Sequence, residues 1–256
     1  MRFLFLFVLM LPNVASSAEI NVAVASNFTH VIKKISALFE ADSGHKVNLS
    51  IASSGKHYAQ IRYGAPFHLF LSADQEKPVV LEQSGSVVTG SRFTYAIGKL
   101  VLVAAKRVSE EPPQSILMSG SFERIAIANP KLAPYGKAAE ETLRALDLWG
   151  ANQAKLVMGE NIAQTYQFLN TGNVDLAFIS VSQLLDNSLI DVQEVWDIPA
   201  SMYTPIRQDA VLLKSAEDLP AAMEFYNFLK NEKVVRMIES FGYRVPKSQN
   251  IGSELE

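Results

Sequence analysis

Four polar turns in the chain hold residue types that bind small anions. They are Ser26, Ser53-Ser54-Gly55, Pro134-Tyr135-Gly136 and Asn161-Ile162, and each precedes or opens an expected helix. The first N–H groups of a helix lack intrahelical partners, and the helix dipole places about half a positive charge there. Such an end binds an anion without any lysine or arginine. Because Ser and Asn are also common helix caps, each turn alone predicts only a cap.

A second chemistry competes for one of these turns. Ser53 and Lys56 have the Ser-x-x-Lys spacing of the nucleophile and base in penicillin-recognising serine enzymes. Neither Ser-Asp-Asn nor Lys-Thr-Gly, the other motifs of those enzymes, occurs in the chain. Ser72 and Asp74 follow another strand, but the sequence places no histidine to complete a triad. We therefore predict that the protein is not an enzyme and keep a serine hydrolase using Ser53 and Lys56 as the weaker alternative.

Neither a metal cation nor a cofactor is predicted. The four histidines, His30, His45, His57 and His68, lack His-Glu-x-x-His or other tight ligand spacing. The chain has no cysteine, which excludes disulfides, thiolate metal sites and a lipid-acceptor cysteine. The glycine-rich phosphate-binding motifs of nucleotide-binding proteins are also absent from the sequence. We expect Lys56 and His57, just after the second serine turn, to be solvated.

The elements that position these turns alternate between strand and helix. Strands are predicted over 20–25, 47–51, 68–71, 95–97, 99–104, 124–128, 155–158, 174–179 and 203–213. Helical spacing follows several of them, ending at 43–44, 64, 83, 148 and 171–172, and helices cover 220–230 and 232–241. This order predicts an α/β fold of mostly parallel sheets flanked by helices, with ligands beyond the carboxyl ends of the strands.

The same scheme occurs twice, which predicts two lobes with a ligand cleft between them. We assign 1–18 to a signal peptide, 19–97 plus 203–256 to the first lobe, and 98–202 to the second lobe. The final helices have no sheet of their own, so they are returned to the first lobe. A hinge is expected near Gly98 and in the return segment 200–205, where the chain crosses between lobes.

The start of the chain has the layout of an export signal. Met1-Arg2 is followed by nine apolar residues, 3–11, and by Ala15-Ser16-Ser17-Ala18. A helix needs roughly 20 apolar residues to span a bilayer, so we predict cleavage near Ala18 and no membrane insertion of the mature chain. The expected location is the periplasm.

The charge balance limits the partners. The net charge is −3, with both signs interspersed along the chain. This pattern excludes the broad basic surface that binds nucleic acid, and it means that a bound anion must be met by local groups. We expect a monomer.

Several stretches resemble the periplasmic molybdate-binding proteins of ABC transporters, which are type II periplasmic substrate-binding proteins. In the first half they are VAVAS at 22–26, IASSG at 51–55, IRYGAP at 61–66 and LFLSAD at 69–74. In the second half they are ANP at 128–130, APYG at 133–136, GENI at 159–162 and NVDLA at 173–177. The resemblance covers essentially the whole mature chain.

The resemblance implies a binding protein that closes around a tetrahedral oxyanion, molybdate or tungstate, and delivers it to an inner-membrane ABC permease. It implies that Ser26 and Ser54 donate hydroxyl and amide hydrogens, and that Tyr135 and Ile162 donate backbone N–H groups. Where the family usually has a tyrosine hydroxyl, this chain has Ser180. Further lobe closure, a water, Tyr135 or Lys56 would then replace the missing donor.

The Ser180 difference leaves other ligands open. The alternatives are sulfate, chromate, phosphate or a small organic anion, and a sensing module that reports to a membrane partner. The neutral donor set predicts selection by size and protonation, because donors without acceptors reject an anion that carries its own hydrogen.

Overall fold

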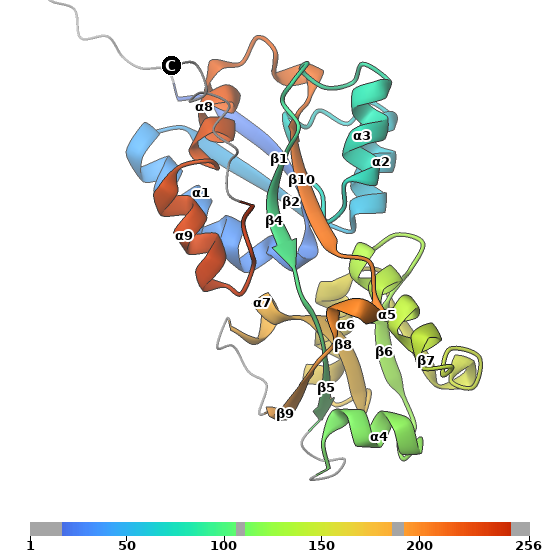
Figure 1. Ribbon diagram of the computed structural model, residues 1–256. Coiled ribbons are helices and arrows are strands. Elements are labelled where there is room, and N and C mark those ends of the chain that lie inside the picture. Colours follow the sequence, from blue (N-terminus) through green and yellow to red (C-terminus); the bar gives the residue numbers. More distant parts are fainter. Residues whose placement is uncertain (1–16, 106–110, 186–191, 247–256) are drawn as a thin grey trace, which may run out of the picture.

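The computed structural model describes residues 17–105, 111–185 and 192–246 and shows two lobes, one above the other in Figure 1. Most of the predicted signal peptide, 1–16, therefore lies outside the described residues. The first lobe has the strand order β2-β1-β3-β10-β4, and the second has the order β7-β6-β8-β5-β9. The first five are Lys46–Ala52, Glu19–Ala25, Leu69–Leu71, Ile206–Leu212 and Phe93–Gly98; the second five are Leu156–Gly159, Ile125–Ala128, Leu176–Ser180, Leu100–Ala105 and Val192–Asp197.

Both sheets are mixed, and most strands of each run in the same direction, as the sequence predicted. In the first lobe β1 pairs in parallel with β2 and β3, and β10 pairs antiparallel with β3 and β4. In the second lobe β6 pairs in parallel with β7 and β8, and β5 pairs antiparallel with β8 and β9. The antiparallel ladders arise because one strand in each sheet, β10 in the first lobe and β5 in the second, runs against the other four. The two-lobed α/β fold itself is confirmed.

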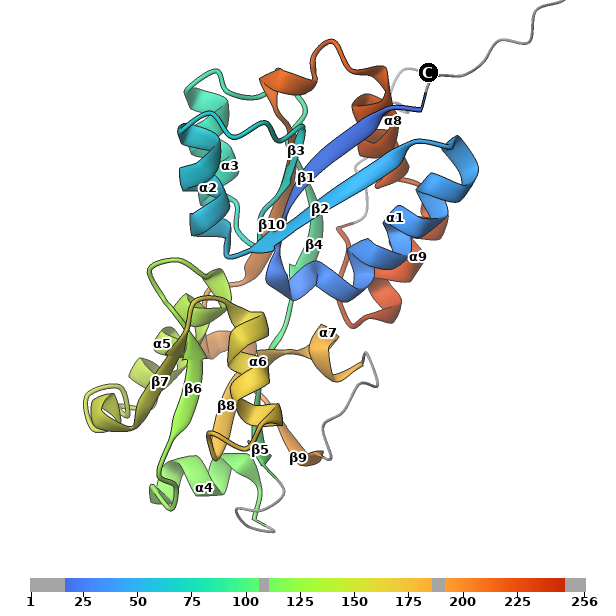
Figure 2. The same ribbon diagram turned by 180° about the vertical axis from the view of Figure 1, so that it is seen from behind.

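Helices flank both sheets (Figures 1 and 2). Those of the first lobe are α1 Thr29–Ser43, α2 Ser54–Arg62, α3 Glu76–Gln83, α8 Pro220–Phe228 and α9 Glu232–Ser240. Those of the second lobe are α4 Pro113–Ser119, α5 Pro134–Ala145, α6 Ile162–Asn170 and α7 Val181–Leu184. No helix in the described ranges is long and apolar enough to cross a membrane.

The helical spacing of apolar residues accounts for the packing of α1. Val31, Ile32, Ile35 and Phe39 share one face of the helix and are buried in the core of the first lobe. Gly44 ends the helix with a left-handed φ of 75°, a conformation that glycine adopts without steric cost. The helix is thereby fixed against the sheet, and the turn that precedes it is held at the lobe interface.

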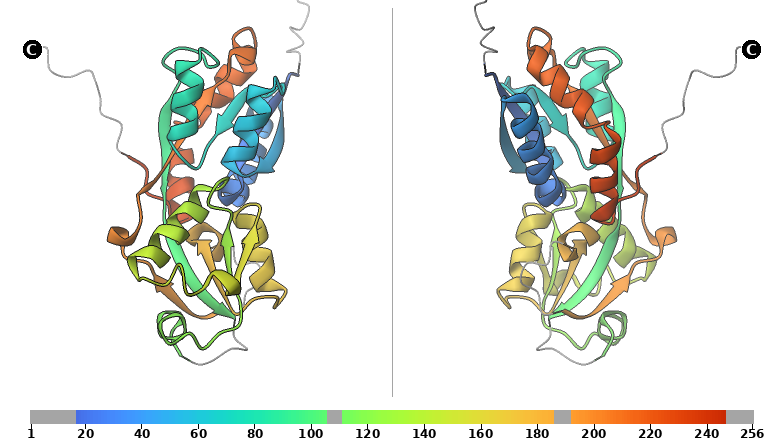
Figure 3. Two further views of the ribbon diagram at one scale, coloured as in Figure 1. Left: turned by 90° about the vertical axis from the view of Figure 1, so that its right-hand side faces the viewer. Right: turned by 90° about the vertical axis from the view of Figure 1, so that its left-hand side faces the viewer.

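The strands that connect the lobes run along one side of the molecule (Figure 3). β4 ends at Gly98 and β5 begins at Leu100, while the return passes through the 3-10 helix Ala200–Met202 to β10. A Cβ atom on Gly98 would lie 2.0 Å from the Tyr135 hydroxyl oxygen, so only glycine fits at this crossing. The predicted lobe boundaries at 97/98 and 202/203 stay predictions.

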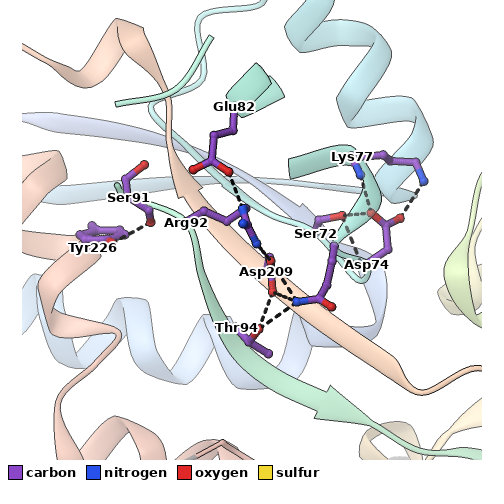
Figure 4. Close-up of polar contacts among 10 residues, drawn as sticks. Ser72, Asp74, Lys77, Glu82, Ser91, Arg92, Thr94, Asp209 and Tyr226 are labelled. Carbon is purple, nitrogen blue, oxygen red and sulfur yellow. Dashed lines mark hydrogen bonds and ion pairs between the residues drawn. The ribbon is translucent and has the colours of Figure 1, made fainter. Parts of the chain in front are cut away.

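Strand β10 is fixed in the first lobe by a buried carboxylate (Figure 4). The register of β10 against β4 shifts between Gln208 and Asp209. Asp209 accepts hydrogen bonds from Arg92 Nη1 at 2.9 Å and from Thr94 Oγ1 at 2.7 Å. Gln208, also fully buried, contacts Asn27 instead. The register shift in β10 thus lies between two neighbouring residues, Gln208 and Asp209, whose buried side chains form hydrogen bonds with different partners.

Candidate functional site

A small cavity lies between the lobes, with an empty volume of about 190 Å³ including its mouth. Its lining comes from the ends of β1 and β3 and from the first residues of η1 (Ser26–Phe28), α2, α5 and α6. The lining residues are Ala25, Ser26, Asn27, Ser53, Ser54, Ala73, Ala133, Pro134, Tyr135 and Ile162. None of these described lining residues is charged. Four helix beginnings therefore meet at one uncharged cavity, where the helix dipoles favour negative charge.

Two serines form the first-lobe wall of this cavity. Ser26 begins η1 directly after β1, and Ser54 is the first residue of α2. Both side chains are buried. The Ser54 hydroxyl oxygen accepts the N–H of Ala73 at 2.8 Å, so its own proton remains for donation to a ligand. This contact also holds the end of β3 against the start of α2.

The second-lobe wall comes from the first turns of α5 and α6. Pro134 opens α5, where its missing N–H costs no helical hydrogen bond, and Tyr135 follows. Asn161 caps α6, and its side-chain oxygen accepts the N–H groups of Ala163 and Gln164 at 3.0 and 3.1 Å. That cap leaves the N–H of Ile162, the first helical residue, outside the capping interaction. Backbone donors of both helices thus stand next to the cavity.

The Tyr135 hydroxyl is directed away from the cavity, toward the interlobe crossing. Its oxygen accepts a hydrogen bond from Gln208 Nε2 at 3.4 Å and lies next to Gly98. Burial raises the pKa of Tyr135 well above its usual value. Tyr135 therefore has a backbone amide near the cavity and a neutral phenol near the interlobe crossing at Gly98.

Ser180 is the one predicted ligand residue that is not part of the cavity lining. It caps the short helix α7, and its hydroxyl lies 3.0 Å from both Ser182 Oγ and Gln183 Oε1. Gln183 Oε1 also accepts the backbone N–H of Ser180 at 3.0 Å, which completes a capping box. The four other predicted ligand residues, Ser26, Ser54, Tyr135 and Ile162, do line the same cavity.

The expectation that His57 is solvated is wrong. His57 is 0% exposed, and its ring nitrogens lie 3.2 Å from the Val24 carbonyl oxygen and 3.1 Å from Gln60 Oε1. The spacing of α2 places it beneath the helix and against β1, while the cavity lies beyond the helix end. Burial lowers the pKa of His57 below 6.5.

Lys56 forms an ion pair between the lobes. Its ammonium lies 2.8 Å from Glu160 Oε1, and both side chains are about half exposed. Ser53 acts as the cap of α2, with its hydroxyl oxygen accepting the Lys56 N–H at 3.4 Å. The amine that a hydrolase would need as its base is thus occupied by a carboxylate of the other lobe.

Asn27 is a lining residue that the sequence reasoning did not select. Its side-chain nitrogen donates to Gln208 Oε1 at 2.8 Å and to the Tyr243 hydroxyl at 3.0 Å. These bonds hold the Asn27 side chain against Gln208 of β10 and against Tyr243. Its position could have indicated a ligand residue. Asn27 directly follows Ser26, so its backbone N–H is also one of the first N–H groups of a helix, which have no intrahelical partner.

Comparisons with known proteins agree with this architecture. A family model described as bacterial extracellular solute-binding protein matches residues 20–244. The molybdate-binding protein ModA of Azotobacter vinelandii is 46% identical over 229 residues, which cover 90% of this chain and 91% of that protein. ModA of Rhodobacter capsulatus is 41% identical over 229 residues, which cover 90% of this chain and 89% of that protein.

A solved structure is similar across the same region. The Azotobacter vinelandii periplasmic molybdate-binding protein superimposes with a TM-score of 0.83 at 35% identity, covering 89% of this chain and 100% of that one. The family match spans both lobes, including the four helix beginnings at the cavity. The chain therefore belongs to the bacterial extracellular solute-binding protein family.

Proposed function

We propose that this protein captures a tetrahedral oxyanion, molybdate or tungstate, between its lobes and delivers it to an inner-membrane ABC permease. The observation that carries the proposal is the convergence of four helix beginnings on one small cavity with an uncharged lining. The proposed donors are the hydroxyl and amide groups of Ser26 and Ser54 and the N–H groups of Tyr135 and Ile162. The names of the relatives support molybdate as the first ligand to test.

A neutral donor site of this kind suits a fully ionised dianion. Each charge-assisted hydrogen bond contributes about 1.5–3 kcal/mol net, so several of them replace the hydration of the anion. Backbone N–H groups cannot accept a proton from the ligand, and the Ser54 oxygen already accepts one hydrogen bond, from the Ala73 N–H. Hydrogen phosphate is therefore disfavoured by its proton, and sulfate is distinguished by its smaller size.

Transport of the anion, without chemical change, is the role we propose. The family assignment and the uncharged cavity support binding, and the Lys56–Glu160 pair gives the hydrolase alternative no free base. We also propose export to the periplasm after cleavage near Ala18, and a monomeric mature protein. The apolar segment 3–11 and the periplasmic location in the name of the similar structure support export, and the cavity walls that both come from one chain support a monomer.

Isothermal titration of the mature, anion-free protein with molybdate, tungstate, sulfate and phosphate at neutral pH tests the proposal. We expect one-to-one binding of molybdate and tungstate and much weaker binding of the other two. Ser54→Ala removes one hydroxyl donor and is expected to weaken molybdate binding by about 1.5–3 kcal/mol, or roughly tenfold to 150-fold.

Ser240→Ala is the matched control, because this exposed serine ends α9 and its hydroxyl donates to the carbonyl of Met237 in the same helix. Its affinity should equal that of the wild type. If no oxyanion binds, the ligand assignment fails while the fold stands. Organic anions and acylation of Ser53 by a β-lactam probe would then be tested.

A further inference from the structure

The short helix α7 belongs to the second lobe and packs directly against the first. It lies at the edge of its lobe that faces the first lobe (Figures 1 and 2). A Cβ atom on Gly242 would lie 2.5 Å from Val181 Cγ1, so the helix approaches the first lobe as closely as glycine permits. Gly242 also has a φ of 79°, a region that favours glycine. The close contact with Val181 and the positive φ both require glycine at position 242, next to α7.

Ser182 of α7 makes the polar contacts across this interface. Its side chain is buried, and its hydroxyl oxygen lies 3.0 Å from the Asn27 carbonyl oxygen and 2.9 Å from the Tyr243 hydroxyl. Tyr243 itself donates to the Asn27 carbonyl at 2.9 Å. Asn27 lines the anion cavity, so Ser182 contacts a cavity residue of the opposite lobe without facing the cavity.

The next residue of the helix braces the other wall of the cavity. Gln183 Nε2 donates to the carbonyl oxygen of Ile162 at 3.0 Å, and its Oε1 accepts from Ser180. Ile162 opens α6 and lines the cavity from the second lobe. Adjacent side chains of α7 thus hold one residue from each wall, on both sides of the interface.

We propose that Ser182 and Gln183 are positioning residues that couple closure of the lobes to assembly of the anion site. Ser182 forms its bonds to Asn27 and Tyr243 only when the lobes meet, whereas the Gln183 bond to Ile162 lies within one lobe. Ser182 therefore stabilises the closed arrangement for any ligand, and Gln183 sets the position of the Ile162 N–H. The identity of the ligand rests on the proposed function, but closure does not.

The chemistry of the interface supports this division. Burial raises the pKa of Tyr243 to about 12, so its hydroxyl is neutral at physiological pH and can donate to the Asn27 carbonyl. A buried polar group that loses its partner pays its full desolvation cost. Separation of the lobes exposes Ser182, Tyr243 and Asn27 to water, which supplies new partners. Ser182, Tyr243 and Asn27 thus form hydrogen bonds with one another when the lobes close.

Ser182→Ala tests the coupling, with Ser240→Ala as the matched control. We expect Ser182→Ala to lower the affinities for molybdate and for tungstate by the same factor, about five- to 20-fold. The substitution removes one buried hydrogen-bonding group that touches neither anion. The loss should appear as faster dissociation in stopped-flow measurements, with the association rate unchanged. Tyr243→Phe, which keeps the ring, should give the same pattern. Unequal factors for the two anions, or unchanged dissociation, would overturn the proposal.

Gln183→Leu separates the second role. This variant removes the donor to the Ile162 carbonyl and should shift the molybdate-to-tungstate affinity ratio by several-fold, because the Ile162 N–H moves relative to the ligand. Ser182→Ala should leave that ratio unchanged. An unchanged ratio in both variants would remove Gln183 from the proposal.

Lobe closure can be followed without any anion, which separates this proposal from the proposed function. Because the chain has no cysteine, labels can be placed at Tyr63→Cys in the first lobe and Met158→Cys in the second, both exposed positions. Distance measurements between these labels should show a smaller closed fraction in Ser182→Ala than in the parent protein. An equal closed fraction would sink the coupling role, whichever ligand the protein takes up.

Discussion

At the scale of single residues, the described part of the protein leaves the buried hydroxyl of Ser36 without a hydrogen-bond partner. An unsatisfied buried polar group costs about 1–3 kcal/mol. Ser36→Ala should therefore raise the free energy of unfolding, by about 1 kcal/mol, while leaving anion affinity unchanged. Urea unfolding of the anion-free protein measures this. A loss of stability would contradict the expectation.

His57 gives the protein a pH dependence at the same scale. Burial lowers its pKa in the folded state below the ordinary value of 6.5. Above pH 6.5 both states hold neutral histidine, and the full stability is present. As the pH falls below 6.5 the unfolded state binds the proton first, so the free energy of unfolding decreases until the lower folded pKa is reached.

The corresponding variant is His57→Gln, measured by urea unfolding at pH 8, 6 and 5. The wild type should lose more stability than the variant between pH 8 and pH 5. Burial also lowers the pKa of His68, so a residual slope in the variant is expected. Parallel curves for the two proteins would contradict the assignment to His57.

At the scale of elements, the start of α2 meets the loop before α5 across the lobe interface. Gly55 donates its N–H to the Leu132 carbonyl at 2.9 Å, and a Cβ atom there would lie 2.9 Å from that same oxygen. Gly55→Ala should therefore hold the lobes apart and lower the affinity for every anion by more than about tenfold. Its ligand-free stability should stay equal or rise, because alanine favours a helix by about 1 kcal/mol over glycine.

Gly150→Ala provides the matched control, since no atom lies within 4 Å of its added Cβ. Titration calorimetry and thermal unfolding of both variants check the expectation. If Gly55→Ala binds as tightly as the control, then α2 and the Leu132 loop do not limit closure.

Most elements could be predicted because each has its own periodicity and its own turn. The strand before Ser26 and the helix after Ser54 follow from local patterns alone. Helix α5 begins at Pro134, inside the turn Pro134-Tyr135-Gly136 that was expected to precede or open a helix, because a proline at the first helical position costs no helical hydrogen bond. The short helices α4 and α7 and the strand β9 were not expected.

At the scale of the whole molecule, the sequence could not show which polar side chains meet across the interface. Asn27 and Tyr243 bond to each other although they are 216 residues apart, and Ser182 joins them from the other lobe. No local pattern encodes such contacts. Ser180 is a predicted ligand residue because of its position in the family resemblance, whereas in the structure its hydroxyl takes part in the cap of α7. The residues at helix beginnings were predictable because their chemistry depends on local backbone geometry.

The Lys56–Glu160 pair joins the two lobes at their surface, and it should act on closure without acting on folding. Exposed ion pairs contribute about 0.2–1 kcal/mol. Because Lys56→Glu and Glu160→Lys each place like charges together, each should weaken anion binding by about two- to five-fold or slightly more. The exchanged double variant should regain most of the affinity at low salt, and the difference should shrink at 1 M salt. Calorimetric titration of the four proteins gives this cycle. Equal losses in the single and double variants would mean that the pair is not formed in the closed, anion-bound protein.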